Sequence, residues 1–332
     1  TSTLPGSTET VTSTDTVTST LPGSTETVTS TDTVTSCSTS TSTSTSTSTS
    51  TPTPTCINEI FGDAGIYNGW FKNDFTGRSD TEGRLAAGGD MTLSQGYSVG
   101  DKLPYANCLG EEMNVTTVAG GKLYWGNGRN YYGSIVVGDY ERSQLGYPIT
   151  SGLEEGCSVW EDKGYMDFEL THNHLRSSSN YLSTDLATQG TYVEYPYHGR
   201  IDVQLPVFEF PRENLIVTVH INPAEFNSAY ELNLAGSDSL VNPIIIVNVG
   251  GPDIEFSGLS LSHWTAYREY VIWNFYEAER VNMHSIEIEG TILAPNARFL
   301  YTSGVIQGQI FGSSFEGSMQ INNRPFKGCL RR

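Results

Sequence analysis

Basic residues are scarce in this sequence. Its 332 residues include 18 Lys and Arg against 37 Asp and Glu, which gives a formal net charge of −19. Four of the acidic residues lie before position 56, so residues 56–332 carry a net charge of −15. A surface this acidic repels nucleic acid and anionic membranes, which argues against both as partners.

Long apolar runs are also missing. No segment approaches the ~20 consecutive apolar residues that a membrane-spanning helix needs, so we expect no membrane insertion. The sequence starts at Thr1, with neither an initiator methionine nor a signal peptide. This start indicates a processed or trimmed chain.

The sequence assigns no catalytic role to any side chain. Two pairs of glutamates, Glu111–Glu112 and Glu154–Glu155, are adjacent in the sequence. A glycosidase instead places two carboxylates at a defined separation across a cleft. We therefore expect no enzyme, and no cofactor apart from the calcium ion considered below.

Cysteine is sparse, with five residues and no Cys-x-x-Cys spacing, so a structural zinc site is not expected. Scattered cysteines are typical of disulfides in an oxidising compartment. Cys56 opens the globular part and Cys329 closes it, so we predict that they pair, with Cys108 and Cys157 as a second pair. Cys37 is then left for a bond between chains, or its partner was lost by trimming. A Cys37–Cys56 loop is the alternative.

The first 55 residues are almost entirely Ser and Thr. Residues 1–17 are repeated without a change at 18–34, and a strict Ser-Thr alternation follows Cys37. Such a segment cannot bury enough apolar surface to fold alone. Its composition is typical of an O-glycosylated stalk, with a bare disordered tail as the alternative. A threonine-rich repeat can also pair as a strand with a neighbouring molecule. The expected O-glycosylation sites are Ser38, Thr39, Ser40, Thr41, Ser42, Thr43, Ser44, Thr45, Ser46, Thr47, Ser48, Thr49, Ser50, Thr51, Thr53 and Thr55.

The remaining residues, 56–332, show the pattern of an all-β domain. From Ser285 to Gly317, apolar and polar residues alternate between glycines, as in short strands that turn at each glycine. Such strands build a coiled β-solenoid or a tight β-sandwich. Helical spacing without Gly or Pro predicts one helix of roughly twenty residues within Tyr165–Leu186. The segment Lys122–Tyr140 predicts two strands about a Gly-Asn-Gly turn. Further strands are predicted within 200–210, 215–221, 242–250, 253–261 and 271–275.

Several sequence blocks, in this order, resemble the choice-of-anchor A domain, an adhesive module of secreted surface proteins. The blocks are SDTEGRLAAGGD (79–90), IVNVG (246–250), IWNF (272–275), GTILAPNA (290–297), GQIF (308–311) and QINNRPF (320–326). Together they cover about residues 57–328. The resemblance implies an extracellular, β-solenoid-like adhesive or structural module, and it supplies no catalytic residues. The Ser/Thr repeats and the lack of a visible anchor depart from a typical member, which speaks against simple cell-wall tethering.

Two patterns resemble metal sites. His172 and His174 lie two positions apart, so on the predicted helix they point to different faces and do not easily share a metal ion, whereas on a strand they could. The stretch NDFTGRSDTEG (73–83) offers oxygen ligands at alternate positions with a glycine turn, which resembles a loose calcium loop. The spacing is not that of an EF-hand and Arg78 lies inside the stretch, so a solvated turn is the default interpretation and a calcium site the alternative.

Aromatic residues near a glycine turn are the predicted ligand surface, because aromatic rings stack on sugars and pack against protein partners. These residues are Trp125, Tyr131 and Tyr132, whereas Trp273 lies in an apolar strand and is predicted to be in the core. The sequon that begins at Asn114 predicts N-glycosylation on a surface loop.

Two functions follow from these patterns. The first is an extracellular structural glycoprotein whose copies assemble into a filament or surface layer through the tail, residues 1–55. The alternative is a monomeric cell-surface adhesin, in which the β-solenoid-like domain, residues 56–332, binds a carbohydrate or protein on a glycosylated stalk. Ice binding is a third option, but it needs a regular threonine array on the folded domain, and the array in this sequence lies in the tail.

Overall fold

The computed structural model describes residues 12–21, 24–33, 59–110, 114–185 and 187–330. The chain divides into two units, residues 1–55 and 56–332. In the first unit, β1 (Thr12–Leu21) and β2 (Ser24–Thr33) form an antiparallel hairpin in which each strand contains part of the repeat. All other described elements belong to the second unit.

Short parallel strands of the second unit stack into a solenoid-like coil with three faces, which confirms the predicted all-β, solenoid-like fold. As the chain winds around the coil, successive turns contribute strand segments to these faces. Face A consists of β18 (Ile216–Ile221), β21 (Ile244–Val249), β23 (Val271–Asn274), the first parts of β26 (Thr291–Gln307) and β27 (Ile310–Asn322), β3 (Gly69–Phe71), β6 (Leu85–Ala87), β9 (Val115–Ala119), β12 (Ser134–Val137) and β14 (Val159–Glu161). Face B consists of β22 (Asp253–Glu255), β24 (Arg280–Asn282), the middle of β26 and β27, β4 (Phe75–Gly77), β7 (Met91–Leu93), β10 (Leu123–Trp125) and β13 (Gln144–Leu145). Face C consists of β25 (Ile286–Glu289), the last parts of β26 and β27, β5 (Asp80–Thr81), β8 (Ser98–Val99) and β11 (Arg129–Asn130).

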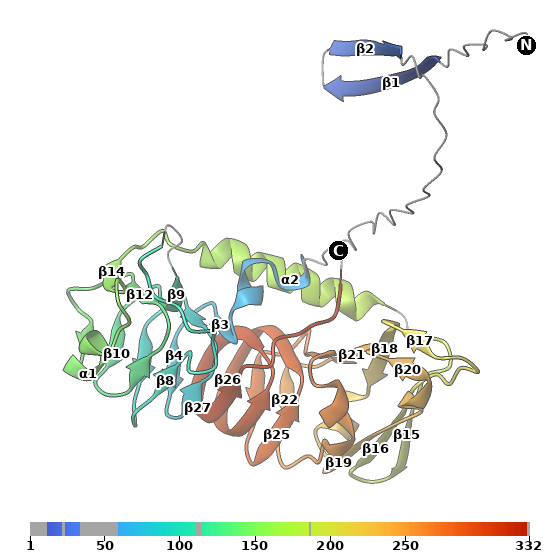
Figure 1. The fold of residues 1–332 in the computed structure, drawn as a ribbon. Coiled ribbons are helices and arrows are strands. Elements are labelled where there is room, and N and C mark those ends of the chain that lie inside the picture. The colour runs from blue at the N-terminus through green and yellow to red at the C-terminus, as the bar shows by residue number, and fades with distance from the viewer. Residues whose placement is uncertain (1–11, 22–23, 34–58, 111–113, 186, 331–332) are drawn as a thin grey trace, which may run out of the picture. The chain divides into compact units, whose positions relative to one another are not determined.

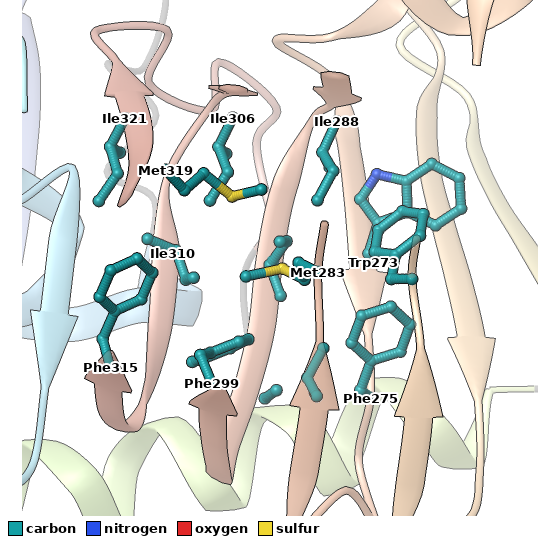
Figure 2. Packing of buried hydrophobic residues seen from close by; sticks show 14 of the residues in the cluster. Trp273, Phe275, Met283, Ile288, Phe299, Ile306, Ile310, Phe315, Met319 and Ile321 are labelled. Atoms are coloured by element: carbon teal, nitrogen blue, oxygen red, sulfur yellow. The ribbon is translucent and has the colours of Figure 1, made fainter. Parts of the chain in front are cut away.

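Apolar side chains inside the coil form rows that run from one turn to the next. Figure 2 shows Ile288, Ile306 and Ile321 in such a row, and their Cα atoms are direct partners on face C. On face B, Phe299 is likewise the partner of Phe315. All five side chains are buried. Because strand residues alternate between two sides, the same period of two that aligns these rows places polar residues outside the coil on faces B and C.

The turns of the coil do not follow the order of the sequence. On face A, β27 from the C-terminal part pairs with β3 from the N-terminal part, and Phe311 is the partner of Trp70. From β3 the chain winds outward to β14, then crosses to β18 and winds back to β27. Figure 1 accordingly shows red C-terminal strands beside cyan N-terminal strands. The first and last turns therefore meet in the middle of the coil.

The crossing is made by α2 (Phe168–Thr184), which falls within the predicted helical segment and lies along face A (Figure 1). Asp167 caps its N-terminus by accepting a 2.8 Å hydrogen bond from the backbone nitrogen of Leu170. Leu175 is buried between α2 and face A, together with side chains of η1 (Glu59–Ile66). The outward side of face A is thus a second apolar core. No helix among the described residues is long and apolar enough to cross a membrane.

Separate elements cover both ends of the coil. One end carries α1 (Tyr147–Ser151) and a loop closed by a disulfide between Cys108 and Cys157. At the other end, Ile201 and Leu232 of a small sheet share a buried cluster with Val219 of β18. Such coverage keeps the edge strands from pairing with other chains. The elements at this second end are β15 (Tyr192–Tyr197), β16 (Arg200–Gln204), β17 (Arg212–Glu213), α3 (Pro223–Phe226), β19 (Glu231–Ala235), η2 (Ser237–Ser239), β20 (Leu240–Val241) and η3 (Ser262–Tyr267).

One predicted element is wrong. The segment Lys122–Tyr140 does not form two strands about its Gly-Asn-Gly turn, but contributes β10, β11 and β12 to faces B, C and A in turn. Each of these strands pairs in parallel with strands of neighbouring turns rather than with the others. A glycine-rich corner of a solenoid and a hairpin turn need the same permissive backbone, so the local sequence does not distinguish them.

Candidate functional site

Two carboxylates of the calcium-loop-like stretch 73–83, those of Asp74 and Glu82, accept hydrogen bonds from backbone nitrogens elsewhere in the coil. Asp74 Oδ1 accepts a 2.8 Å hydrogen bond from the backbone nitrogen of Asp90, and Asp90 Oδ1 accepts one of 2.9 Å from Lys122. Glu82 accepts another, of 2.8 Å, from Asn323. Across the residues that the structure covers, no three His, Cys, Asp or Glu side chains are arranged to hold a metal ion. Hydrogen bonds to these carboxylates connect different turns of the coil at its corners.

The two histidines of α2 face different surroundings. His172 is buried, with Nε2 at 3.0 Å from the carbonyl oxygen of Pro295. Burial, helped by nearby Lys72, lowers the pKa of His172 below its usual value, so the ring is neutral at pH 7. The ring of His174 instead lies over Gly62.

Trp125 is not part of a ligand surface, in contrast to the prediction. Its side chain is fully buried, and its indole nitrogen donates a 3.1 Å hydrogen bond to the carbonyl oxygen of Tyr97. The reason is its position on β10, where Leu123 and Trp125 point into the coil and Tyr124 points outward. Trp273, predicted to be in the core, is also fully buried.

Tyr131 and Tyr132 do reach the surface, where they join a third tyrosine. The ring of Tyr132 lies 5.6 Å from that of Tyr131 and 5.6 Å from that of Tyr105, measured between centroids. The guanidinium of Arg129 lies 4.5 Å from the centre of the Tyr131 ring. Tyr105 is 73% exposed, and the other two tyrosines are half-buried. We call Tyr105, Arg129, Tyr131 and Tyr132 the aromatic patch.

A buried carboxylate holds the aromatic patch in place. Glu154 Oε2 accepts a 2.7 Å hydrogen bond from the backbone nitrogen of Tyr132, and Oε1 lies 3.3 Å from Nη2 of Arg129. Tyr132 has a φ of 55°, a region that non-glycine residues seldom adopt. The backbone nitrogen of Cys108 donates to the carbonyl oxygen of Glu155, and the Cys108–Cys157 disulfide closes the same loop. The rings are therefore presented on a restrained backbone.

Sequence reasoning missed Tyr105, which lies 26 positions before Tyr131 in a segment without regular secondary structure. The available signal was its proximity to Cys108. The predicted Cys108–Cys157 disulfide implies that the segment with Tyr105 lies close to Glu154. Tyr105 is then also close to Tyr131 and Tyr132. The disulfide that brings them together was among the predicted pairs.

Cys329 is disulfide-bonded as well. Its predicted partner, Cys56, and the cysteine left for a bond between chains, Cys37, both lie outside the described residues. The same holds for the expected O-glycosylation sites between Ser38 and Thr55. These predictions stay open.

The predicted N-glycosylation site, Asn114, lies directly before β9 and close to the aromatic patch. Its amide nitrogen donates a 2.5 Å hydrogen bond to the carbonyl oxygen of Tyr132, and its Oδ1 accepts one of 3.0 Å from Arg84. Thr116, the third residue of the sequon, is fully buried. Glycosylation at this position stays a prediction.

A Gly-x-Ser-x-Gly pattern at residues 96–100 also escaped the sequence analysis. In hydrolases this pattern forms a sharp turn between a strand and a helix, which exposes the serine as a nucleophile. Here Ser98 lies within β8, where it is the Cα partner of Asp80 and Arg129 on face C. No helix follows directly, so the structural context of a nucleophile is missing.

Comparison with known families identifies the class of this chain. Residues 60–323 match the model of a family described as "Putative Ice-binding-like adhesive domain". This result agrees with the adhesive class that the sequence blocks indicated, without singling out the choice-of-anchor A family. A search of the curated proteins found no match. The family match, together with the disulfide, indicates an extracellular protein.

The solved structures that are similar include the following two, both at low identity. One is an ice binding protein from an Antarctic Biological Consortium, with 12% identity, a TM-score of 0.30, and coverage of 79% of this chain and 88% of that protein. The other is the DUF3494 domain of an ice-binding protein from Shewanella frigidimarina, with 12% identity, a TM-score of 0.30, and coverage of 80% and 96%.

Proposed function

Because this chain belongs to the family of ice-binding-like adhesive domains, we propose that residues 56–332 act as an extracellular, non-catalytic adhesive module. Attachment takes place through the aromatic patch, and the favoured surface is uncharged and apolar. The observation that carries this proposal is the patch itself, in which three neighbouring tyrosine rings are held on a restrained backbone.

Two physical effects favour such a surface. Tyrosine combines a large apolar ring with few side-chain torsions, so it makes extensive contact at a low cost in conformational entropy. The patch is already ordered by Glu154, which lowers that cost further. The net charge of −15 on residues 56–332 opposes approach to an anionic surface. An uncharged surface gains the ring contacts without this repulsion.

Substitution of the patch tests this assignment. We expect the full chain with Tyr105→Ser and Tyr131→Ser to bind a methyl-terminated monolayer at least about tenfold more weakly, because two ring contacts are lost. A quartz-crystal microbalance at physiological salt measures the binding. The matched control is Tyr147→Ser, since Tyr147 is 81% exposed and makes no ring contact with a described residue. Equal binding by wild type and the double variant would show that the patch is not the attachment site.

Adsorption to ice is not part of the proposal, because the outward side of face B lacks a regular threonine array. Thr76 and Thr92 are Cα partners on neighbouring strands. However, the next outward positions are Tyr124 and Gln144 in one direction and Glu316 in the other. Two threonines within a mixed polar row do not form the repeated array that we expect ice binding to need.

A second candidate function is self-assembly through the tail, for which the hairpin of β1 and β2 gives a reason. The repeat pairs with itself, with Val17 as the partner of Val28. A lone two-stranded hairpin is marginally stable in water, and each strand has one edge that the hairpin does not use. Pairing with the same segment of another copy would provide hydrogen-bond partners for the backbone groups at these edges. We further propose that the Ser/Thr run of residues 38–55 is O-glycosylated.

Proline in both strands tests self-assembly. We expect filaments or sheets of the wild-type full chain in negative-stain electron micrographs, and dispersed particles for the Val17→Pro, Val28→Pro variant. Proline removes a backbone donor and does not fit a ladder of paired strands. Dispersed wild-type particles with an intact tail would reject self-assembly and leave the adhesive proposal untouched.

A further inference from the structure

The small sheet at the end of the coil away from the aromatic patch presents an ordered polar surface. In β15, β16 and β19, residues that are Cα partners lie on the same side of the sheet. The side turned away from the coil carries three such rows, which we call the outer grid. The rows are Tyr197–Arg200–Glu231, Glu194–Asp202–Asn233 and Tyr192–Gln204–Ala235.

The opposite side of the sheet fixes the outer grid on the coil. Ile201 and Val203 of β16 and Leu232 of β19 are buried in the core of the coil. The indole nitrogen of Trp264 also donates a 2.9 Å hydrogen bond to the carbonyl oxygen of Leu232. Pro196 lies in β15, at the edge of the sheet, where it hinders pairing with a further strand. The face of the sheet, rather than its edge, is therefore the part suited to binding.

Hydrogen bonds order the centre of the grid. Asp202 Oδ1 accepts bonds of 2.8 Å from Arg200 Nε and 2.8 Å from Asn233 Nδ2, and Asn233 also donates to Glu231 at 3.2 Å. The hydrogen bond from Arg200 lowers the pKa of Asp202, so this carboxylate is ionised at neutral pH. Asp202 Oδ2, Asn233 Oδ1 and Arg200 Nη2 have no hydrogen-bond partner among the residues that the structure describes.

A hollow of about 270 Å³ lies over this centre. Tyr192, Glu194 and His263 line it together with the central Asp202 and Asn233. Tyr192 is 53% exposed, and Tyr197, at the end of another row, is 50% exposed. The volume is just below the ~300 Å³ at which pockets for drug-sized ligands begin. One or two rings of a longer molecule therefore suit it better than a large compact ligand.

We propose that the outer grid binds a saccharide without acidic groups. A sugar hydroxyl both donates and accepts hydrogen bonds, so it needs donors and acceptors side by side. The hollow is lined by the donor Arg200, by the acceptor Asp202 and by the Asn233 amide, which can do both, so it provides this combination. A metal ion would need acceptors only and an anion donors only, so neither matches the set. The exposed ring of Tyr192 offers a face for stacking against a sugar ring, whereas the Arg200 guanidinium lies 5.6 Å from the centre of the Tyr197 ring and covers one of its faces.

The charge of the grid selects among saccharides. Glu194, Asp202 and Glu231 contribute three carboxylates, against the single guanidinium of Arg200. Sialylated or sulfated sugars are repelled by this excess of negative charge. The site is separate from the aromatic patch, so the module would hold a surface at one end and a saccharide at the other.

A glycan array that contains both neutral and acidic glycans, probed with the full chain, tests this proposal. We expect retained glycans to lack acidic groups, and calorimetry with the best of them to give the affinity. The Tyr192→Ala and Asn233→Ala variants should each bind at least about tenfold more weakly, because one loses a stacking ring and the other a hydrogen-bonding centre. Tyr147→Ser is the control and should leave the affinity unchanged.

Three results would overturn the saccharide site: no glycan is retained, acidic glycans are preferred, or both variants bind as wild type does. The urea unfolding midpoint of each variant is measured as well, because a lowered midpoint marks a variant whose fold, and not only its binding site, has changed. Should Asn233→Ala fail that check, Tyr192→Ala decides, since its side chain is half exposed. Normal binding of the Tyr105→Ser, Tyr131→Ser chain to the array would separate this site from the aromatic patch, whatever becomes of the adhesive proposal.

Discussion

Replacing Gly138 by alanine is expected to lower the free energy of unfolding by at least about 3 kcal/mol. Gly138 follows β12 at a corner of the coil, and a Cβ atom there would lie 1.8 Å from the carbonyl oxygen of Gly120 in the next turn. The same holds one turn further on, where a Cβ atom at Gly120 would lie 2.5 Å from the carbonyl oxygen of Gly88. Both obstacles are backbone atoms, so no side-chain movement relieves the clash.

Gly126→Ala is the matched control, because Gly126 lies at another corner, where a Cβ atom would have no neighbouring atom within 4 Å. We expect its urea unfolding midpoint to stay close to that of wild type. A Gly138→Ala protein as stable as the Gly126→Ala protein would mean that the turns are not stacked as closely as the structure has them. The comparison thus probes the spacing of the coil directly.

Replacing Asn274 by alanine is expected to cost about 3 kcal/mol, because it breaks a buried polar network between α2 and face A. The Asn274 side chain is fully buried. Its amide nitrogen donates to Asn248 Oδ1 at 2.7 Å and to the backbone oxygen of Ser179 at 2.9 Å. Its Oδ1 accepts a 2.6 Å hydrogen bond from the Ser179 hydroxyl. Alanine leaves these partners buried without a replacement.

A double-mutant cycle separates this network from simple loss of packing. Ser179→Ala and Asn274→Ala should be clearly non-additive in the free energy of unfolding, because each removes the partner of the other. The control is Asn173→Ala, on the exposed side of α2, which should change stability by no more than about 0.5 kcal/mol. Additive effects of the two buried substitutions would contradict the network.

The rows of the coil explain which parts of the fold were predictable. On face C, Ile288 and Ile306 lie inside the coil as the period of two requires, whereas Thr291–Pro295 on face A are all buried because both sides of that face are covered. The order of the turns was not predictable, because the pairing of β27 with β3 joins residues more than 200 positions apart. No local pattern encodes a contact over that separation.

The candidate sites likewise depend on contacts between residues that are far apart in the sequence. Tyr131 and Tyr132 were found from a glycine turn, but the same turn misled the analysis about Trp125, because a solenoid corner and a hairpin place the neighbouring residues on different sides. Tyr105 needed the Cys108 disulfide to bring it near. The outer grid needed the register of three strands, and only that register shows that Tyr192 and Asn233 belong to one surface.

In the adhesive proposal, this module attaches to uncharged surfaces and not to anionic ones. The most direct measurement is the adsorption of the wild-type full chain to methyl-terminated and carboxylate-terminated monolayers, followed by quartz-crystal microbalance over a range of salt concentrations. We predict strong adsorption to the methyl surface with little salt dependence, and weak adsorption to the carboxylate surface that increases as salt screens the repulsion. Adsorption to neither surface, or a preference for the carboxylate surface, would contradict the account.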